Sequence, residues 1–525
     1  MRAQMSDWPL RVSSIIDHAA RFHSGRRVLG RNPDGALVET DWFRIRERAL
    51  RVAEGLRRLG VAPGERVGVM AWNTPRHLEL WYGVPGAGAV LHSLNPRLFE
   101  GQLAYIVNHA EDRWIVADAD LAPLIARLAP RLETVKGFIF LTSADRMPPE
   151  APPGSIAYDD WIEEQPADRG WTPVEETDAC GICYTSGTTG DPKGVVYGHR
   201  SNVLHAMTAI QPDALGLSAN DVVMPVVPLF HANGWSTGFS APMAGAGMVL
   251  PGRDMSPAAL HELLEQGVTI TLAVPTVWLQ LLHHLEETGK RFSTLNRVVI
   301  GGSACPRAVL ETFQDKYGVR VCHAWGMTET SPLGSFATLT PELSALSKEE
   351  QVDAQLRTGR PFYGIDLKVS AENGADAPWD GRATGRLMVR GPGVLRRYLK
   401  RDEDATDADG WFDTGDVASI DAHGFIKITD RVKDVIKSGG EWISSIDLEN
   451  LAIGCEGVAE AAAVGAPHPK WDERPVLLVV RSPGSDVSAE RIRAHLGGLM
   501  AKWQIPDDVL FVEEIPHTAT GKISK

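Results

Sequence analysis

Short apolar runs alternate with amphipathic segments over roughly the first 430 residues of the chain. The intervening apolar positions follow the period of a helix. Ser256 and Pro257 begin a helix over 258–265, and Pro306 begins another that Gly318 ends. This alternation predicts a layered α/β fold with largely parallel sheets. The β-branched runs predict strands at 114–117, 137–141, 222–227, 269–274 and 297–300.

The pattern changes after residue 430. A basic turn, Arg431-Val-Lys-Asp434, leads into two adjacent glycines, and the remainder predicts helices from Ser444 and over 488–502, with strands at 461–464 and 476–480. We therefore expect a large multi-subdomain N-terminal domain at 1–430, with layered sheets and helices. A hinge would join it to a small α+β C-terminal domain at 431–525.

Length and composition fit this division. A chain of 525 residues is too long for one core. Its 43% hydrophobic and 23% charged residues are typical of globular proteins. The net charge of −14 argues against nucleic acid as a partner, because phosphate backbones require a basic face. Backbone N–H groups can still hold the phosphates of a nucleotide.

We predict no targeting or membrane segment. Residues 1–27 are polar and amphipathic, and the longest apolar stretch, 241–251, is interrupted by Gly and Pro. The five cysteines are sparse and odd in number, as in a reducing compartment. We expect a cytoplasmic protein without membrane insertion.

Cys180 and Cys183 form a C-x-x-C pair, which allows a metal or redox interpretation. They lie in a short apolar run that predicts a buried strand, where positions three apart face opposite sides. The sequence has no second pair to complete a zinc site. We therefore predict two buried thiols and no metal here.

The segment Tyr184-Thr-Ser-Gly-Thr-Thr-Gly-Asp-Pro-Lys-Gly194 combines glycines, hydroxyl residues and a lysine directly after that strand. Small residues let backbone N–H groups approach phosphate, hydroxyls donate, and Lys193 adds positive charge. The spacing is not that of a Walker A loop. From the residues alone, a flexible surface loop stays open as the alternative.

This segment resembles the phosphate loop of the adenylate-forming superfamily, which includes acyl-CoA synthetases, luciferases and the adenylation domains of peptide synthetases. The match extends over residues 15–525 and implies a large N-terminal domain with a mobile C-terminal domain. Further segments resemble the other family motifs, in order: Gly301-Gly-Ser-Ala-Cys-Pro306, His323-Ala-Trp-Gly-Met-Thr-Glu329, Gly410-Trp-Phe-Asp-Thr-Gly-Asp416, Asp430-Arg-Val-Lys-Asp-Val-Ile-Lys-Ser-Gly-Gly-Glu-Trp-Ile443 and Pro516-His-Thr-Ala-Thr-Gly-Lys522.

The resemblance implies a nucleotide site with Mg²⁺ as the cofactor. Thr185 and Glu329 would hold Mg²⁺, since a hard cation suits a hydroxyl and a carboxylate. Trp325 stands where relatives commonly have Tyr, and an indole can also stack on adenine. ATP or AMP would contact Thr185, Ser186, Gly187, Thr188, Thr189, Gly190, Lys193, Ser303, Ala304, Ala324, Trp325, Gly326, Thr328, Asp416 and Arg431.

The resemblance also implies the catalytic and acyl sites. Lys522 would be the catalytic lysine of adenylation, and Lys433 the hinge residue. Family members often continue beyond the Lys522 motif, which favours a shortened C-terminus. The acyl group and coenzyme A would contact His231, Trp235, Gly302, Lys437, Gly439, Gly440, Glu441 and Trp442.

The implied reaction is that of an AMP-forming acyl-CoA synthetase. ATP would convert a small carboxylic acid to an acyl-adenylate with release of pyrophosphate, and coenzyme A would then displace AMP. In relatives the C-terminal domain rotates between these steps. The implied partners are therefore ATP, coenzyme A and a carboxylic acid. Relatives are often homodimers through the large domain, so we also expect a homodimer.

The substrate is indicated by the segment Phe230-His-Ala-Asn-Gly-Trp235. It lacks the Asp that pairs the substrate ammonium in amino-acid-activating relatives, which disfavours amino acids. Trp235 resembles the gate Trp of fatty acyl-CoA synthetases, with a core aromatic as the alternative. His231 either contacts substrate or is a buried histidine. Residues 7–20 and the hinge most resemble ligases for methylmercaptopropionate, which favours that acid.

Three other functions are alternatives to this one. A medium-chain fatty acid–CoA ligase would fit the same pocket motifs. An adenylating enzyme that loads a carrier protein, or releases a free adenylate, is disfavoured because the chain has no appended carrier domain and has the segment 437–442. A non-catalytic nucleotide-binding protein would require lesions in the motifs, and the motifs are intact.

Overall fold

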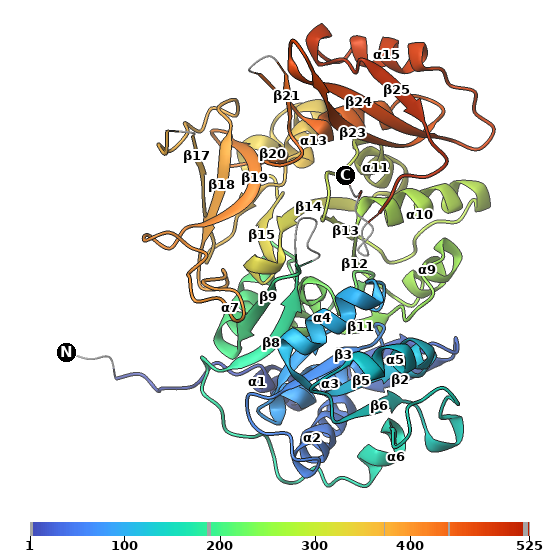
Figure 1. The fold of residues 1–525 in the computed structure, drawn as a ribbon, viewed down its shortest axis with the longest axis vertical. Coiled ribbons are helices and arrows are strands. Elements are labelled where there is room, and N and C mark those ends of the chain that lie inside the picture. The colour runs from blue at the N-terminus through green and yellow to red at the C-terminus, as the bar shows by residue number, and fades with distance from the viewer. Residues whose placement is uncertain (1–3, 186–190, 372, 439–440, 518–522, 524) are drawn as a thin grey trace.

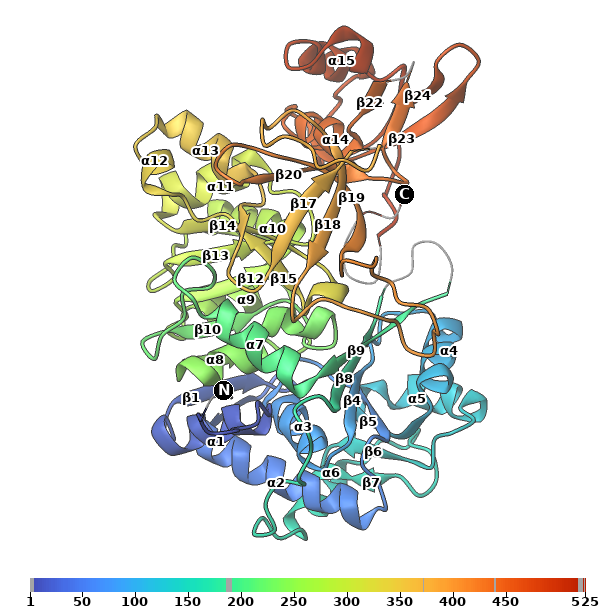
Figure 2. The ribbon, with the colours of Figure 1, turned by 90° about the vertical axis from the view of Figure 1, so that its left-hand side faces the viewer.

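The structure is a computed structural model that describes residues 4–185, 191–371, 373–438, 441–517, 523 and 525. Within these residues the strands form four sheets, of nine, seven, five and four strands. Figure 1 shows the seven-stranded sheet at the bottom, the nine-stranded sheet in the middle and the four-stranded sheet beside it. The five-stranded sheet lies at the top with two helices. Figure 2 shows the same layers from the side.

The seven-stranded sheet is parallel except at the pair formed by its last two strands. That antiparallel pair flanks residues 185–193, so the predicted phosphate segment connects two strands of this sheet. The order is β7 (Ile156–Ala157), β6 (Gly137–Leu141), β5 (Asp112–Asp118), β3 (Arg66–Met70), β4 (Val90–Ser93), β8 (Ala179–Tyr184) and β9 (Gly194–Gly198).

The nine-stranded sheet has a parallel centre and antiparallel edges. Every residue of β11 and β12 is buried, as expected for parallel strands covered on both faces. The order is β16 (Arg360–Pro361), β15 (Leu333–Phe336), β14 (Arg320–Gly326), β13 (Arg297–Ile300), β12 (Ile270–Ala273), β10 (Val222–Pro225), β11 (Gly247–Leu250), β1 (Arg27–Arg31) and β2 (Leu37–Asp41).

Helices cover both sheets, and several begin at side chains that cap their free N–H groups. Asp41, Thr74 and Ser256 each accept a bond from a backbone N–H in the first turn. The helices are α1 (Ser13–Phe22), α2 (Trp42–Arg58), α3 (Pro75–Gly86), α4 (Glu100–Ala110), α5 (Ala122–Leu128), α6 (Tyr158–Glu163), α7 (His199–Ala209), α8 (Thr237–Ala244), α9 (Pro257–Leu264), α10 (Pro275–Thr288), α11 (Arg307–Glu311), α12 (Pro341–Ser344) and α13 (Lys348–Leu356).

The four-stranded sheet is an antiparallel meander that leads into the predicted hinge. Its strands are β17 (Asp366–Ser370), β18 (Gly385–Arg390), β19 (Phe412–Ile420) and β20 (Ile426–Arg431).

The C-terminal part has a core of its own. Leu448, Leu477 and Ile492 belong to a cluster drawn from residues 436–509. The predicted boundary at residue 430 stays a prediction. The elements are α14 (Ser445–Ile453), α15 (Ala489–Gly497) and the strands β22 (Glu441–Ile443), β21 (Ile436–Ser438), β24 (Asp472–Arg481), β23 (Val458–His468) and β25 (Asp508–Phe511).

The α/β architecture is confirmed, and differences from the predicted elements are local. The helix after Pro306 is α11 followed by a π-helical turn over Thr312–Lys316. The helix predicted over 488–502 ends at Gly497, because two consecutive glycines have low helix propensity. Among the described residues, no helix is both long and apolar enough to cross a lipid bilayer.

The two thiols of the C-x-x-C pair face opposite sides of β8, as predicted. Cys180 packs in the core that contains α1 to α3, whereas Cys183 packs against the four-stranded sheet. Both are buried, and neither is in a disulfide.

Candidate active site

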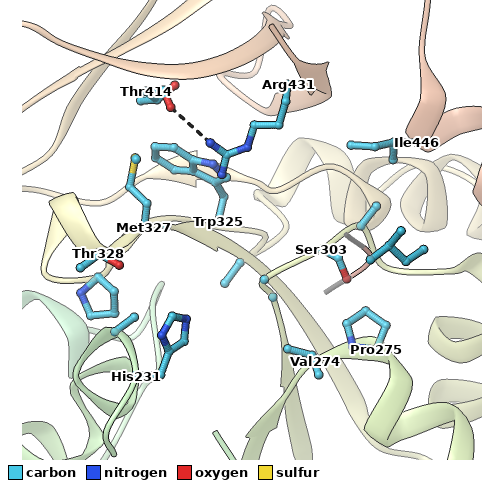
Figure 3. A pocket seen from close by; sticks show the side chains of 18 of the residues that line it. His231, Val274, Pro275, Ser303, Trp325, Met327, Thr328, Thr414, Arg431 and Ile446 are labelled. Carbon is cyan, nitrogen blue, oxygen red and sulfur yellow. Dashed lines mark hydrogen bonds between the residues drawn. The ribbon is translucent and has the colours of Figure 1, made fainter. Parts of the chain in front are cut away.

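A cavity of about 730 Å³ lies where the nine-stranded sheet, the four-stranded sheet and the C-terminal part meet. Residues directly after β12, β13 and β14 line it, as does Val227, two residues after β10. The carboxyl ends of parallel strands are the usual binding edge of an open α/β sheet. Figure 3 shows Trp325 and Arg431 on one side of the cavity. His231 and Val274 lie on the other side.

A glycine on the next strand, Gly334, leaves the space that the indole of Trp325 occupies. A Cβ at Gly334 would lie 2.4 Å from Cζ3 of Trp325. Only glycine leaves room for the ring at this point of β15. Trp325 is 9% exposed and presents its ring at the cavity wall.

Asp416 joins two elements on this side of the cavity. Its Oδ2 accepts a hydrogen bond of 2.8 Å from Nε1 of Trp325. Its Oδ1 lies 2.7 Å from Nε of Arg431, which is directly opposite it across β19 and β20. Arg431 also donates to the carbonyl of Thr414 at 3.5 Å (Figure 3). Asp416 is 3% exposed and is not among the residues that line the cavity.

Glu329 is a buried acid at the cavity, in a short turn after β14. Its Oε1 accepts a hydrogen bond of 2.7 Å from the hydroxyl of Tyr398. Burial raises the pKa of Glu329, while the Tyr398 bond and the charges of Arg431 and Lys193 oppose that rise. The Lys193 ammonium lies 5.0 Å from the centre of the Tyr398 ring. A cation bound in the cavity would stabilise the ionised form of a carboxylate in this setting.

Thr185 and Lys193 are tied together at the two ends of the predicted phosphate segment. The Thr185 N–H donates to the Lys193 carbonyl at 2.9 Å, and the Lys193 N–H donates to Oγ1 of Thr185 at 3.3 Å. These bonds extend the β8–β9 pairing by one step. They hold the Thr185 hydroxyl and the Lys193 side chain at the cavity.

The opposite side of the cavity contains the segment around Trp235. The six-membered ring of Trp235 lies over Gly301, where a Cβ would meet Cη2 at 2.9 Å. Ala232, Trp235 and Ser236 have φ values of 38°, 51° and 68°. A run of non-glycine residues in this region stores backbone strain, which is typical of functional sites. His231 begins this segment and also lines the cavity.

Asn73 fixes the chain that leads into this segment. Its amide nitrogen donates to the carbonyls of Pro225 and Val227 at 2.9 Å each, and its oxygen accepts from the N–H of Leu229 at 2.8 Å. The side chain is 1% exposed. One buried amide thereby satisfies three backbone groups at the cavity edge.

The C-terminal part closes the cavity from above. Glu449 and Asn450 of α14 line it, together with Glu460 of β23. Ile523 and Lys525, near the end of the chain, line it as well. Figure 1 shows the C-terminus between the C-terminal part and the nine-stranded sheet.

Most residues predicted for the site lie around this single cavity. Two described residues do not line it: Asp416 is buried, and Lys437 on β21 is exposed, with its N–H bonded to Glu473 at 2.9 Å. The lining includes Thr185, Lys193, His231, Trp235, Gly302, Ser303, Ala304, Ala324, Trp325, Gly326, Thr328, Glu329, Arg431 and Lys433.

Other predicted site residues lie outside the described part of the structure: Ser186, Gly187, Thr188, Thr189, Gly190, Gly439, Gly440 and Lys522. The same holds for the side chains of Glu441 and Trp442. Their roles stay predictions.

Tyr398 and Asn73 are two site residues that the sequence did not indicate. Tyr398 is 69 positions from Glu329, and Asn73 is more than 150 positions from the carbonyls that it binds. Neither lies in one of the motifs, so no local pattern marks them.

Comparisons with known proteins agree with this site. The AMP-binding enzyme family matches residues 17–399, and the AMP-binding enzyme C-terminal domain matches residues 447–522. A 3-methylmercaptopropionyl-CoA ligase of Ruegeria lacuscaerulensis is 46% identical over 100% of this chain and 98% of its own length. A medium-chain-fatty-acid–CoA ligase of Ectopseudomonas oleovorans is 45% identical over 100% of this chain and 96% of its own length.

Among solved structures, an anthranilate CoA ligase in complex with anthranoyl-AMP superposes with a TM-score of 0.88. It is 25% identical, and the match covers 99% of this chain and 97% of that one. The chain described here belongs to the AMP-binding enzyme family, and within it to the adenylate-forming acyl-CoA ligases.

Proposed function

We propose that this enzyme joins 3-methylmercaptopropionate, or a short- or medium-chain acid of similar size, to coenzyme A through an acyl-adenylate. The observation that carries the proposal is one cavity with two chemically different sides. Trp325, Arg431 and Glu329 form a polar side, and Val274 with Trp235 forms an apolar side. The relative at 46% identity is named for this acid, and the relative at 45% is named for medium-chain fatty acids.

The first step requires a carboxylate to attack the α-phosphorus of ATP, although both are anions. Positive charge must therefore be placed where negative charge develops. Lys193 supplies one such charge from the end of the phosphate segment. Arg431, oriented by Asp416, supplies another beside the ribose or phosphates. In this proposal Lys522 bridges the carboxylate and the α-phosphate, and its neighbour in sequence, Ile523, lines the cavity.

Thr185 and Glu329 are the residues that would hold Mg²⁺. Both line the cavity, and their donors are hard oxygens of the kind that Mg²⁺ prefers. Glu329 is buried in a setting that raises its pKa, so a bound cation would stabilise its ionised form. When bound, Mg²⁺ supplies charge neutralisation for the departing pyrophosphate. Thr328, beside Glu329, would contact the α-phosphate.

The second step is attack of the coenzyme A thiol on the acyl-adenylate, with AMP as leaving group. We assign the described arrangement to the first step, because Ile523 and Lys525 line the cavity while Lys437 is exposed outside it. Rotation about Lys433 would then bring the segment 437–442 to the cavity for the second step. The part that would rotate is the C-terminal domain, residues 431–525.

We further propose that the enzyme acts in the cytoplasm and as a homodimer through its large domain. The first part is supported by the sparse cysteines, which are buried and not in disulfides. The second is supported by the family resemblance, and sedimentation velocity of the purified protein tests it.

The test of the proposed function is a panel of acids assayed for AMP release with and without coenzyme A. The panel contains 3-methylmercaptopropionate and straight-chain acids from propionate to decanoate. We expect release that depends on coenzyme A, with 3-methylmercaptopropionate among the best substrates. A preference confined to octanoate and decanoate would favour the medium-chain ligase. Release that is independent of coenzyme A would contradict thioester formation.

A further inference from the structure

Lys525 takes part in a buried polar cluster on the C-terminal side of the cavity. Its Nζ lies 2.7 Å from Oε1 of Glu449 and donates to the hydroxyl of Ser445. The side chains of Lys525 and Glu449 are only 12% and 11% exposed. The same Oε1 of Glu449 accepts a bond of 2.8 Å from the N–H of Ala463. The pair therefore ties three elements: the chain end, α14 and β23.

The cluster also spans the proposed hinge. The Ser445 N–H, at the start of α14, donates to Oδ2 of Asp430 at 2.6 Å. Asp430 lies at the end of β20 and is 1% exposed. The charge of Lys525 opposes the rise that burial causes in the pKa of both Asp430 and Glu449. A buried carboxylate is costly without such a partner, so the lysine has a defined energetic role.

A second attachment holds the same stretch of chain on its other side. His517 and Ile523 form an antiparallel bridge. Nε2 of His517 lies 2.6 Å from Oε1 of Glu460, which lines the cavity. Residues 518–522 therefore connect two positions that are themselves fixed to the C-terminal part. Lys522 is the last of these connecting residues.

From this geometry we propose that Lys525 is a positioning residue for adenylation. Through Glu449 and Ser445 it fixes the chain three residues beyond Lys522, so that the catalytic ammonium reaches the cavity in one geometry. The inference rests on the proposed function and adds to it a residue that need not touch either substrate. Preorganisation of this kind matters because a misplacement of about 1 Å can cost about 100-fold in rate.

The experiment compares Lys525→Met with Lys525→Arg in the full-length enzyme. Two rates are measured: acid-dependent exchange of pyrophosphate into ATP, and thioester formation from acyl-adenylate prepared beforehand. We expect Lys525→Met to lower the exchange rate about 10- to 100-fold. The KM for ATP and the rate from acyl-adenylate should stay within about twofold. Lys525→Arg keeps the charge and should restore most of the exchange.

Glu449→Gln and the double variant Glu449→Gln/Lys525→Met test whether the two residues act as a pair. If they do, the double variant loses no more exchange than Lys525→Met alone. Lys502→Met, an exposed lysine of the same domain, is the matched control for the removal of one charge. Thermal melting of each variant reports any loss of folding.

Three results would overturn the inference: unchanged exchange in Lys525→Met, an equal fall in both rates, or effects of the two substitutions that multiply. If Lys525→Met does not fold, failure of Lys525→Arg and Glu449→Gln to differ from wild type in exchange would also overturn it. Absence of exchange in the wild-type enzyme would instead refute the proposed function.

Discussion

Trp325, Asp416 and Arg431 form one unit in which a single carboxylate orients an indole and a guanidinium. The two acceptor oxygens of Asp416 are divided between these partners. Loss of either bond leaves a buried charge less well compensated, so each partner affects the position of Asp416. If Asp416 contacts the nucleotide as predicted, its two partners would therefore affect nucleotide binding.

Trp325→Phe tests this unit by removing the donor while keeping a ring. A hydrogen bond to a charged group contributes about 1.5–3 kcal/mol. A water molecule that replaces the indole donor would restore part of this free energy. We therefore expect the KM for ATP to rise about 5- to 10-fold with a small change in kcat. Trp379→Phe, at an exposed position, is the control. An unchanged KM for ATP in Trp325→Phe would show that Asp416 does not depend on the indole.

Tyr398→Phe tests the electrostatics of Glu329. The Tyr398 hydrogen bond lowers the pKa of Glu329 against the effect of burial, so its removal raises that pKa further. If Glu329 holds Mg²⁺ as proposed, only its ionised carboxylate can do so, and activity should be lost as pH falls through this pKa. We expect the acidic limb of kcat/KM to move to higher pH in Tyr398→Phe. Tyr363→Phe, at an exposed position, should leave the limb in place.

The elements of the fold follow from local sequence patterns more fully than the site does. Apolar runs such as those of β12 and β13 are predictable because parallel strands are buried on both faces. The sequence motifs predict which individual residues lie at the ends of strands. The bond between Trp325 and Asp416 joins positions 91 apart, and its geometry depends on how two sheets pack. The positive φ of Trp235 likewise has no local signal.

Val274 lies between β12 and α10, and its substitution tests whether the acyl chain of the substrate binds at this part of the cavity wall. Phenylalanine at this position takes up volume on the side of the cavity that also contains His231 (Figure 3). Each methylene of a substrate contributes about 1–3 kcal/mol in an apolar pocket. We expect Val274→Phe to lower kcat/KM for octanoate at least 10-fold more than for propionate, while Val274→Ile changes the ratio little. An equal loss for both acids would place the acyl chain elsewhere.

At the scale of the whole molecule, the proposed mechanism requires the C-terminal part to serve two chemical steps from two positions. In the described arrangement it presents Glu449, Ile523 and Lys525 to the cavity and leaves Lys437 outside. The bond from Ser445 to Asp430 connects residues on the two sides of the proposed hinge at Lys433. We expect the proposed rotation to break this bond, so that other contacts would have to hold the second position.

Lys433→Pro tests the rotation, because proline fixes φ near −65° at the proposed hinge. We expect adenylation to be largely kept and thioester formation from acyl-adenylate to fall by about 100-fold or more. Lys433→Ala, which leaves the backbone free to rotate, is the matched variant. Equal effects of Pro and Ala on the second step would argue against a hinge at this residue.

The most direct test of the account is the exchange of labelled pyrophosphate into ATP by the full-length enzyme without coenzyme A. The account predicts exchange that requires Mg²⁺ and a carboxylic acid, and that 3-methylmercaptopropionate supports. Absence of exchange with every carboxylate offered would contradict adenylation at this cavity.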